Sequence, residues 1–357
     1  MKILVAGNEP GGMYRFRIDL IRTLLKDNSV TVLVPDGEFV QAMQQEGCGF
    51  RDTPMERRGM NPKEDLKLLR LYRDIIKDEN PDYVVTYTIK PNIYCGLVCR
   101  YMKIPYAANI TGLGTTFQND NAIKRLVTRL YKAALKDVKV AFFENVGNRD
   151  IFVREQIVPE EKTCILNGAG VNTQHYVYTP YPAGSGTRFL FIGRIMAEKG
   201  FDELITAMRK LNADGFDVCL DVVGFCEEAY EEKLKQCQEE GWMDFHGRQQ
   251  DVRPFIINAH CFVLPSWHEG MANTNLECAS MGRPVITTNI HGCMEAVEDG
   301  VTGLLCEKQN VDDLYAKMKV FLSLSYEERR TMGLAGRKRM EELFDKKRVV
   351  QATIDSL

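Results

Sequence analysis

The chain has 357 residues, of which 45% are hydrophobic and 27% charged; these fractions are typical of a soluble globular protein and exclude disordered and fibrous classes. Its length predicts two domains of about 150 residues each. The net charge is −3, but residues 1–165 hold 25 Lys and Arg against 21 Asp and Glu, a net charge of +4, which leaves −7 for the remainder. A mildly basic first half fits an anionic partner such as a membrane surface, and equally an ordinary solvated surface.

Eleven cysteines are scattered without a Cys-x-x-Cys pair, which indicates reduced thiols in a cytoplasmic protein rather than a disulfide framework. The start, MKILVAG, is too short an apolar run for a signal peptide. No segment approaches the roughly 18 apolar residues of a membrane span. Any association with the cell membrane is therefore expected to be peripheral and on its inner face.

Short apolar, β-branched runs alternate along the chain with longer amphipathic segments. In chain order, the runs predicted to be strands are KILVA, VTVLV, DYVVTY, VKVAFF, RFLFIG, DVCLDVVG, HCFVLP and PVITT. Strands that alternate with helical patterns predict right-handed βαβ crossovers and parallel sheets that are covered on both faces. The sequence therefore predicts an α/β protein with doubly wound, Rossmann-like sheets.

A segment rich in Gly, Pro, Thr and Tyr lies within about residues 168–186 and is predicted to link two domains. The predicted domains are residues 1–168 and 169–340, each with a Gly-containing turn after its first strand. Residues 341–357 are predicted to form a helix that crosses back to the first domain. Because doubly wound folds bind ligands at the carboxyl ends of their strands, we expect the site in a cleft between the two domains.

Several motifs of common nucleotide chemistry are missing. The sequence holds no Asp-x-Asp pair, so the carboxylates that commonly hold a divalent cation on a nucleotide diphosphate are absent, and it has neither a P-loop nor a Gly-x-Ser-x-Gly motif. The first turn, GNEPGG, lacks the Gly-x-Gly-x-x-Gly spacing of a dinucleotide site. All histidines lie in the second half, at positions 175, 246, 260, 268 and 291, so no histidine base or metal cluster comes from the first domain.

The stretch FIGRIMAEKG carries two cations at a predicted strand-to-helix turn. We expect the strand to end at Gly193 and the helix to begin near FDELITAM, with Arg194 and Lys199 flanking the turn. Guanidinium, ammonium and the N–H groups of a helix N-terminus all favour anionic oxygen, so this turn suits a diphosphate. Taken alone, either side chain would more often be a surface charge.

The stretch SWHEGMANTNLE places Glu269 and Glu277 eight positions apart. A helix is expected to start around Ala272 to Thr274, capped by Asn273 or Thr274, with Glu269 in the loop before it. Ionised carboxylates only accept hydrogen bonds, so both glutamates suit the paired hydroxyls of a ribose or hexose. Compensation of the helix dipole would explain Glu277 but would leave Glu269 unexplained.

These motifs, followed by GRPVI and HGCMEAVEDGVTGLL, resemble those of the retaining nucleotide-sugar glycosyltransferases of family 4, which have the two-domain GT-B fold. The resemblance implies that Arg194 and Lys199 hold the nucleotide diphosphate, and that these two residues and Glu269 carry catalysis. Glu277 would bind the ribose hydroxyls and Glu269 a hydroxyl of the donor sugar, with Glu295 in the loop that lines the site. The other residues that the resemblance assigns to the nucleotide-sugar, several of them as backbone donors, are Gly12, Gly193, Gly270, Met271, Ala272, Asn273 and Thr274.

The first domain resembles a narrower branch of this family through PMERRGMNP and TYTIKPNIYCGLVCRYMKIPYAANITGLG. That branch contains bacterial enzymes that extend polyprenyl-diphosphate-linked sugars, including N-acetylgalactosaminyltransferases of glycan assembly. Gly11 and Gly12 match the family's glycine turn. Many members carry a histidine where NITGLG has Thr111, so Thr111 is placed on the acceptor side without a histidine's role. The cations that the resemblance offers to the lipid diphosphate, each of which fits a solvated surface charge equally well, are Arg15, Arg17, Arg57, Arg58 and Lys90.

The sequence therefore predicts a retaining transferase that needs neither a metal nor a cofactor and does not bind nucleic acid. The predicted donor is UDP-HexNAc and the predicted acceptor a polyprenyl-diphosphate-linked saccharide; another UDP-hexose or a soluble acceptor is the nearest alternative. A nicotinamide-dependent oxidoreductase is favoured only by the βαβ pattern, and the missing Gly-x-Gly-x-x-Gly opposes it. A silent sugar-nucleotide-binding protein is opposed by the intact residues of the predicted donor site.

Overall fold

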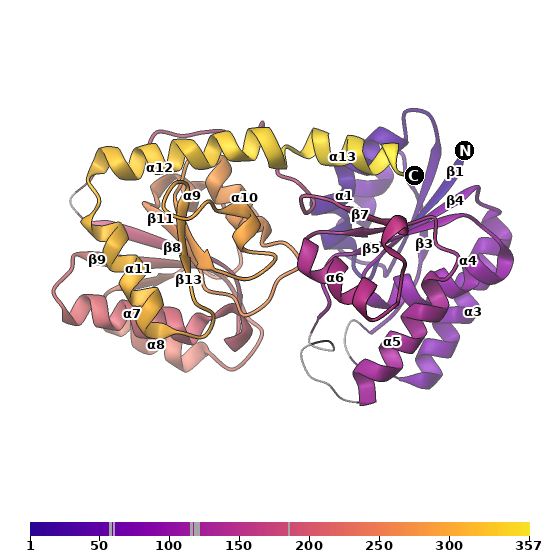
Figure 1. Cartoon of the computed structure of the whole chain (residues 1–357), viewed down its shortest axis with the longest axis horizontal. Coiled ribbons are helices and arrows are strands. Elements are labelled where there is room, and N and C mark those ends of the chain that lie inside the picture. The colour runs from indigo at the N-terminus through magenta and orange to yellow at the C-terminus, as the bar shows by residue number, and fades with distance from the viewer. Residues whose placement is uncertain (57–58, 60, 115–116, 118–121, 185) are drawn as a thin grey trace. The chain divides into compact units, whose positions relative to one another are not determined.

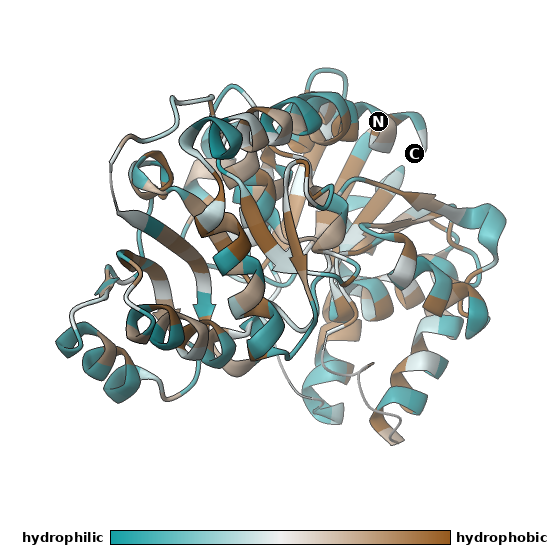
Figure 2. Ribbon diagram, turned by 60° about the vertical axis from the view of Figure 1, so that its left-hand side comes forward, coloured by the Kyte–Doolittle hydropathy of each residue, from teal (hydrophilic) through white to brown (hydrophobic). Residues whose placement is uncertain are grey.

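The structure is a computed structural model that describes every residue except 57–58, 60, 115–116, 118–121 and 185 (Figure 1). Apolar residues run along the strands, whereas the outward faces of the helices are polar (Figure 2). No helix within the described ranges is both long and apolar enough to cross a membrane.

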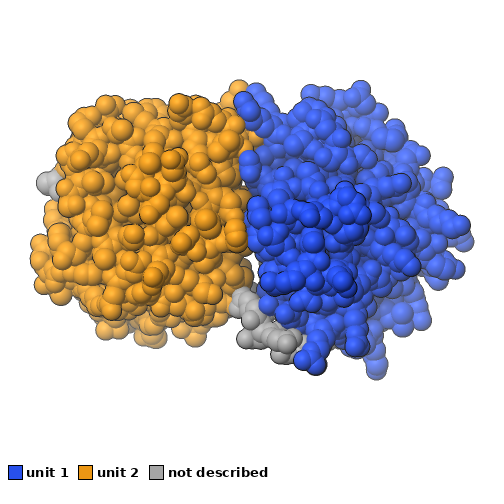
Figure 3. All heavy atoms as spheres, viewed as in Figure 1, with its two compact units in different colours: residues 1–169, 347–357 blue, residues 170–346 orange. Residues whose placement is uncertain are grey.

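The chain divides into two compact units (Figure 3). Unit 1 consists of Met1–Ala169 and Lys347–Leu357, and unit 2 of Gly170–Lys346. Unit 2 includes the segment 341–346, which the sequence assigned to the returning helix, because Met340 and Phe344 are buried in the core of unit 2.

Unit 1 is built on a parallel sheet with the strand order β3-β2-β1-β4-β5-β6-β7. The strand order reverses between β1 and β4, which makes this the switch point where doubly wound folds bind ligands. The strands are β1 (Lys2–Ala6), β2 (Ser29–Val34), β3 (Gly49–Asp52), β4 (Tyr83–Tyr87), β5 (Tyr106–Ile110), β6 (Val140–Phe143) and β7 (Thr163–Ile165).

Helices cover both faces of this sheet. Leu4 and Ala6 of β1 belong to one buried cluster, whereas Ile3 and Val5 belong to another, as expected when successive side chains point to opposite faces. Val349 of the C-terminal helix is buried in the second cluster. The helices that complete the unit are α1 (Pro10–Leu24), α2 (Val40–Gln45), α3 (Pro62–Glu79), η1 (Pro91–Cys95), α4 (Gly96–Met102), α5 (Ala122–Leu135), α6 (Val146–Arg154), η3 (Glu160–Lys162) and α13 (Lys346–Asp355).

Unit 2 is built on a second parallel sheet, with the order β10-β9-β8-β11-β12-β13 and its switch point between β8 and β11. Two Rossmann-like units are the architecture that the sequence predicts for a GT-B fold. The strands are β8 (Thr187–Ile195), β9 (Val218–Cys226), β10 (Met243–Phe245), β11 (Cys261–Leu264), β12 (Val285–Thr288) and β13 (Gly303–Cys306).

One large hydrophobic cluster lies between this sheet and its helices. It includes the fully buried Phe189 and Phe191 of β8 and Phe262 of β11. The helices of unit 2 are η4 (Ala197–Lys199), α7 (Phe201–Ala213), α8 (Glu231–Glu239), α9 (Arg253–Asn258), α10 (Asn273–Ser280), η5 (Met294–Ala296), α11 (Val311–Ser323), α12 (Tyr326–Arg339) and η6 (Met340–Phe344).

Candidate functional site

Two loops of unit 2 meet at the switch point of its sheet. The loop after β8 reaches α7 through Gly200, whose φ is +69° and whose added Cβ would clash with the carbonyl oxygen of Pro265 in the loop after β11. The amide of Trp267 donates to the carbonyl of Glu198 over 2.9 Å, so the same two loops are also joined by a backbone hydrogen bond. Glycine is required at position 200 because only it combines this φ with so close an approach.

The loop after β12 packs against the loop that follows β11. The amide of Ala272 donates to the carbonyl of Gly292 over 2.7 Å. Gly292 has a φ of +92°, and a Cβ there would lie 2.5 Å from the carbonyl oxygen of Glu269. Three loops at the carboxyl ends of adjacent strands thus form one backbone-supported platform, where doubly wound folds bind ligands.

The structure brings Lys199 and Glu269 together on this platform. The Lys199 ammonium forms an ion pair with Oε1 of Glu269, and the side chains are only 17% and 12% exposed. The hydroxyl of Ser266 donates to the same carboxylate oxygen over 2.8 Å. Burial acts to raise the pKa of Glu269, but Lys199 and Ser266 outweigh it and hold that pKa below its ordinary value. Glu269 is therefore an ionised acceptor at neutral pH.

Arg194 lies on the same edge but has a different partner. Its guanidinium is 3.7 Å from the carboxylate of Glu227, and its side chain is 35% exposed. The strand does not end at Gly193 as expected, because the β8 ladder with β9 continues through Arg194 to Ile195. Gly193 is also backed closely by β9, since a Cβ on Gly224 would clash with the Gly193 carbonyl oxygen.

Helix α10 begins at Asn273, inside the predicted range, but its cap differs from the expectation. The N-cap residue is Ala272 without a side-chain cap, so neither Asn273 nor Thr274 caps the helix. The amide of Ala272 is occupied by Gly292, which removes it from the expected backbone donors. Met271 is buried, and Oδ1 of Asn273 is a buried acceptor without a hydrogen-bond partner. A buried polar atom of this kind is an expected feature of a binding site.

Glu277 lies in the second turn of α10 and contacts Tyr176. Burial raises the pKa of the Tyr176 phenol, and the charge and hydrogen bond of Glu277 raise that pKa further. The Tyr176 backbone is anchored in turn, because its carbonyl accepts hydrogen bonds from Ser280 at 2.7 Å and from Arg337 at 2.8 Å. A half-buried, protonated phenol therefore orients the Glu277 carboxylate.

We expect Glu277→Gln to raise the KM for the donor about ten- to a hundredfold and to leave kcat nearly unchanged, since a charged hydrogen bond contributes roughly 1.5–3 kcal/mol. The family resemblance assigns Glu277 to ribose hydroxyls, which lie away from the breaking bond, and a contact there would stabilise ground and transition states alike. Steady-state kinetics check this, with the exposed helix residue Glu232, changed to Gln, as the matched control. A lowered Tm with unchanged kinetics would instead assign Glu277 to helix stability.

Glu295 lies in η5, after the Gly292 turn. Its carboxylate accepts a hydrogen bond from the Gly292 amide at 2.7 Å and lies 2.9 Å from Nδ1 of His291. Arg339 donates to the Glu295 carbonyl over 2.9 Å. Glu295 therefore shapes the loop that packs against Glu269.

In unit 1, the two glycines lie in the first turn of α1 rather than in the turn before it. Glu9 caps this helix, because its carboxylate accepts the Gly12 amide over 2.8 Å, so this amide is not available to a ligand. Arg15 is exposed, with its guanidinium 5.1 Å from the ring centroid of Phe39.

Other unit 1 cations expected at a lipid diphosphate have carboxylate partners. Arg17 is paired with Glu144 at 2.6 Å, with side chains 13% and 9% exposed. Lys90 lies 3.0 Å from Asp65. Thr111 directly follows β5 and is half-buried, and Arg57 and Arg58 lie outside the described residues. Pairing with a carboxylate neutralises Arg17 and Lys90 in this structure, as it does Lys199 in unit 2.

Sequence reasoning missed four residues that contact the predicted site residues. Ser266 and His268 stand beside Glu269 in the stretch SWHEGMANTNLE, and His268 lies 3.6 Å from Glu198. Their position next to the motif was a usable signal. Glu227 and Tyr176 have no such signal, because their partners Arg194 and Glu277 are distant in the sequence.

The two Rossmann-like units and the loop platform of unit 2 define a glycosyltransferase of the GT-B class. Residues 2–145 match the family model described as "Glycosyl transferase 4-like", and residues 186–323 match "Glycosyl transferases group 1". The two matches span most of the chain, which belongs to these glycosyltransferase families and is an enzyme of that type.

Known relatives and solved structures agree with this assignment. The chain is 25% identical over 342 residues to the N,N'-diacetylbacillosaminyl-diphospho-undecaprenol alpha-1,3-N-acetylgalactosaminyltransferase of Campylobacter jejuni, covering 90% of this chain and 89% of the relative. A glycosyltransferase from Rickettsia africae has a TM-score of 0.80 at 19% identity, covering 99% of this chain and 97% of that one. Anabaena Alr3699/HepE in complex with UDP-glucose has a TM-score of 0.82 at 17% identity, covering 100% of each chain. These structural likenesses confirm the GT-B fold.

Proposed function

We propose that the protein is a retaining, metal-independent glycosyltransferase that moves HexNAc from UDP-HexNAc to a polyprenyl-diphosphate-linked saccharide in the assembly of a bacterial surface glycan or glycoprotein glycan. The observation that carries the proposal is the Lys199–Glu269 ion pair at the switch point of unit 2. It joins a cation suited to a diphosphate and a carboxylate suited to a sugar hydroxyl in one place.

In the proposed reaction, an acceptor hydroxyl oxygen bonds to C1 of the donor sugar on the face from which the diphosphate leaves. The bond between C1 and the diphosphate oxygen breaks, and the hydroxyl proton passes to the departing diphosphate. No nucleophile from the protein is required. Lys199 and Arg194 stabilise the charge that develops on the diphosphate, which is the transition-state interaction that accelerates the reaction. Glu269 holds the sugar ring in place for transfer.

One relative supports the proposed acceptor class. The Campylobacter relative is named for transfer of N-acetylgalactosamine to a diphospho-undecaprenol-linked sugar. A screen of UDP-sugars against short polyprenyl-diphosphate-linked saccharides tests the proposal, with UDP release measured and the new linkage determined by NMR. We expect turnover with a UDP-HexNAc and an α-linked product. A β-linked product, or turnover only with soluble acceptors, would contradict the proposal.

We expect turnover to continue in EDTA. The sequence has no Asp-x-Asp pair, and the charges of Arg194 and Lys199 take the role that a divalent cation has in other transferases. UDP release is measured with EDTA, with magnesium and with manganese. Activity lost on chelation and restored by either metal would refute the metal-free mechanism.

We also propose that the protein binds the inner membrane surface peripherally, as its acceptor is lipid-linked and residues 1–165 carry a net charge of +4. In flotation experiments the full chain is expected to rise with vesicles that contain anionic lipid and to rise less as the salt concentration increases. Equal flotation with neutral vesicles at all salt concentrations would rule out the electrostatic part of this proposal.

A further inference from the structure

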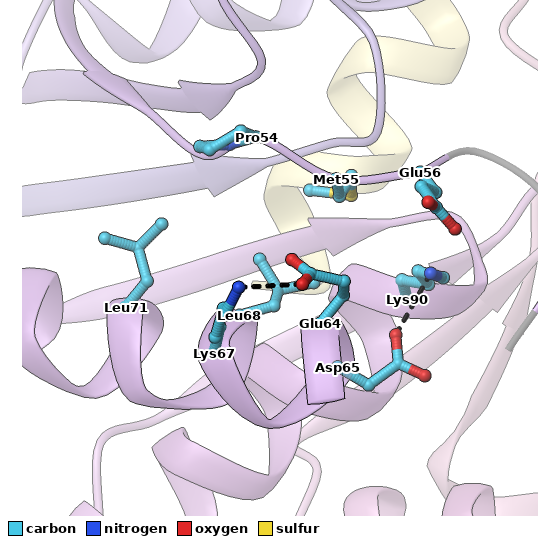
Figure 4. Close-up of a pocket in the computed structure, with 9 residues that line it drawn as sticks. All are labelled: Pro54, Met55, Glu56, Glu64, Asp65, Lys67, Leu68, Leu71 and Lys90. Carbon is cyan, nitrogen blue, oxygen red and sulfur yellow. Dashed lines mark hydrogen bonds and ion pairs between the residues drawn. The ribbon is translucent and has the colours of Figure 1, made fainter. Parts of the chain in front are cut away.

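Unit 1 contains a pocket of about 490 Å³ beside the first turns of α3 (Figure 4). Its walls are the segment 54–56 after β3, the helix α3, and Lys90, which lies shortly after β4. The pocket therefore opens near the carboxyl ends of two parallel strands, where ligands of this fold class bind. Its volume lies within the range of roughly 300–1,000 Å³ that small-molecule sites occupy.

One part of the pocket is apolar. Leu68 is 3% exposed and belongs to the core of unit 1, while Met55 and Leu71 pack against that core from the pocket side. Pro54 continues this surface above α3 (Figure 4). Such a surface favours methyl or methylene groups of a ligand, because contact with them removes apolar area from water.

The other part is polar, and both of its lysines are already paired with carboxylates. Lys90 is paired with Asp65 at 3.0 Å, and the two side chains are only 12% and 8% exposed. Lys67 is paired with Glu64 at 2.7 Å, also within the pocket lining. With Glu56, the described lining residues carry three carboxylates and two ammonium groups. The described lining therefore has an excess of hydrogen-bond acceptors and a net negative charge.

The charges of the described lining residues favour a neutral ligand over a diphosphate. An incoming phosphate would meet the carboxylates of Asp65 and Glu64 as well as the two lysines. These carboxylates carry the same sign of charge as the phosphate and would repel it. A sugar fits better, because its hydroxyl and amide N–H groups donate to carboxylates while the Lys90 ammonium donates to a carbonyl oxygen.

We propose that this pocket binds an N-acylated sugar of the acceptor, with the acyl methyl group on Met55, Leu68 and Leu71 and the polar groups of the sugar at the carboxylate end. The inference rests on the proposed function and specifies its acceptor: the sugar to be extended, or one next to it, carries an N-acyl group. Lys90 then serves the acceptor saccharide and not the lipid diphosphate.

The test compares Leu71→Gln with Leu66→Gln in the full chain. Both leucines are on α3, but Leu66 is 49% exposed and does not line the pocket, so it is a matched control. The substrates are two polyprenyl-diphosphate acceptors that end in N-acetylglucosamine or in glucose. We expect Leu71→Gln to raise the KM for the N-acetylated acceptor about tenfold. This is the size of the discrimination that one small apolar group contributes in a hydrophobic pocket. The KM for the other acceptor, the donor KM and all parameters of Leu66→Gln should remain unchanged.

A KM unaffected by Leu71→Gln, or raised equally for both acceptors, would overturn the inference. If the wild-type protein turns over no polyprenyl-linked acceptor, the proposed function fails separately. The pocket is then tested by saturation-transfer NMR with the methyl glycoside of N-acetylglucosamine. A signal that Leu71→Gln removes and Leu66→Gln retains supports the sugar site, and a signal that is absent or equal in all three proteins overturns it.

Discussion

Glu269→Gln is expected to lower kcat about ten- to a hundredfold with a smaller change in the donor KM. The substitution keeps the size of the side chain but removes the charge that pairs with Lys199. The sugar ring changes position and charge most during transfer, so a contact with it is worth most in the transition state. Steady-state kinetics and a melting curve are measured together.

A double-mutant cycle sharpens this test. Lys199→Met and Glu269→Gln each break the same ion pair, so the double variant should lose much less activity than the product of the two single losses. Glu232→Gln, on an exposed position of α8, is the matched control. A fully active but less stable Glu269→Gln protein would show that this carboxylate has only a structural role.

Arg283→Met is expected to lower the stability of unit 2 by about 3–5 kcal/mol, because it removes the shared donor of several buried hydrogen bonds. Arg283 is fully buried, and its guanidinium donates to carbonyl oxygens at 2.8 to 3.4 Å. These acceptors belong to Thr179, Pro180, Ile256, Ile257, Met281 and Gly282. Methionine fills similar volume but leaves these acceptors unpaired, and each buried unpaired group costs about 1–3 kcal/mol.

Urea unfolding followed by circular dichroism measures the change. Arg330→Met is the matched control, since the Arg330 side chain on α12 is 41% exposed and such surface changes stay within about 0.5 kcal/mol. The stability of Arg283→Lys should fall between those of Arg283→Met and Arg330→Met, because one ammonium replaces only some of the guanidinium's hydrogen-bond donors. If Arg283→Met unfolds at the same urea concentration as Arg330→Met, the buried network does not stabilise unit 2.

The central strands were readable from the sequence because strands buried on both faces are apolar along their whole length. KILVA and PVITT illustrate this, and both became the interior strands β1 and β12. The edge strands β3, β7, β10 and β13 were not predicted. Each has only three or four residues and a neighbour on one side, so its local pattern is weak.

One interior strand was also missed. β5, with the sequence YAANI, is buried throughout although alanine and asparagine are poor strand formers. The side chain of Asn109 is satisfied only by tertiary contact, since it donates to the Thr86 carbonyl on β4 at 3.2 Å. The pairing of β5 with β4 and β6 overrides the low strand propensity of its residues.

For the candidate site, the sequence by itself determined the family resemblance and the spacing of Arg194, Lys199, Glu269 and Glu277, because these features are local patterns of residue type. Only the tertiary structure decided which charges meet. Lys199 pairs with a carboxylate 70 positions away, Arg17 with one 127 positions away, and Lys90 with Asp65 rather than standing free. Such pairings depend on how the strands are ordered in the sheet, and that order brings together residues whose local sequences contain no information about each other.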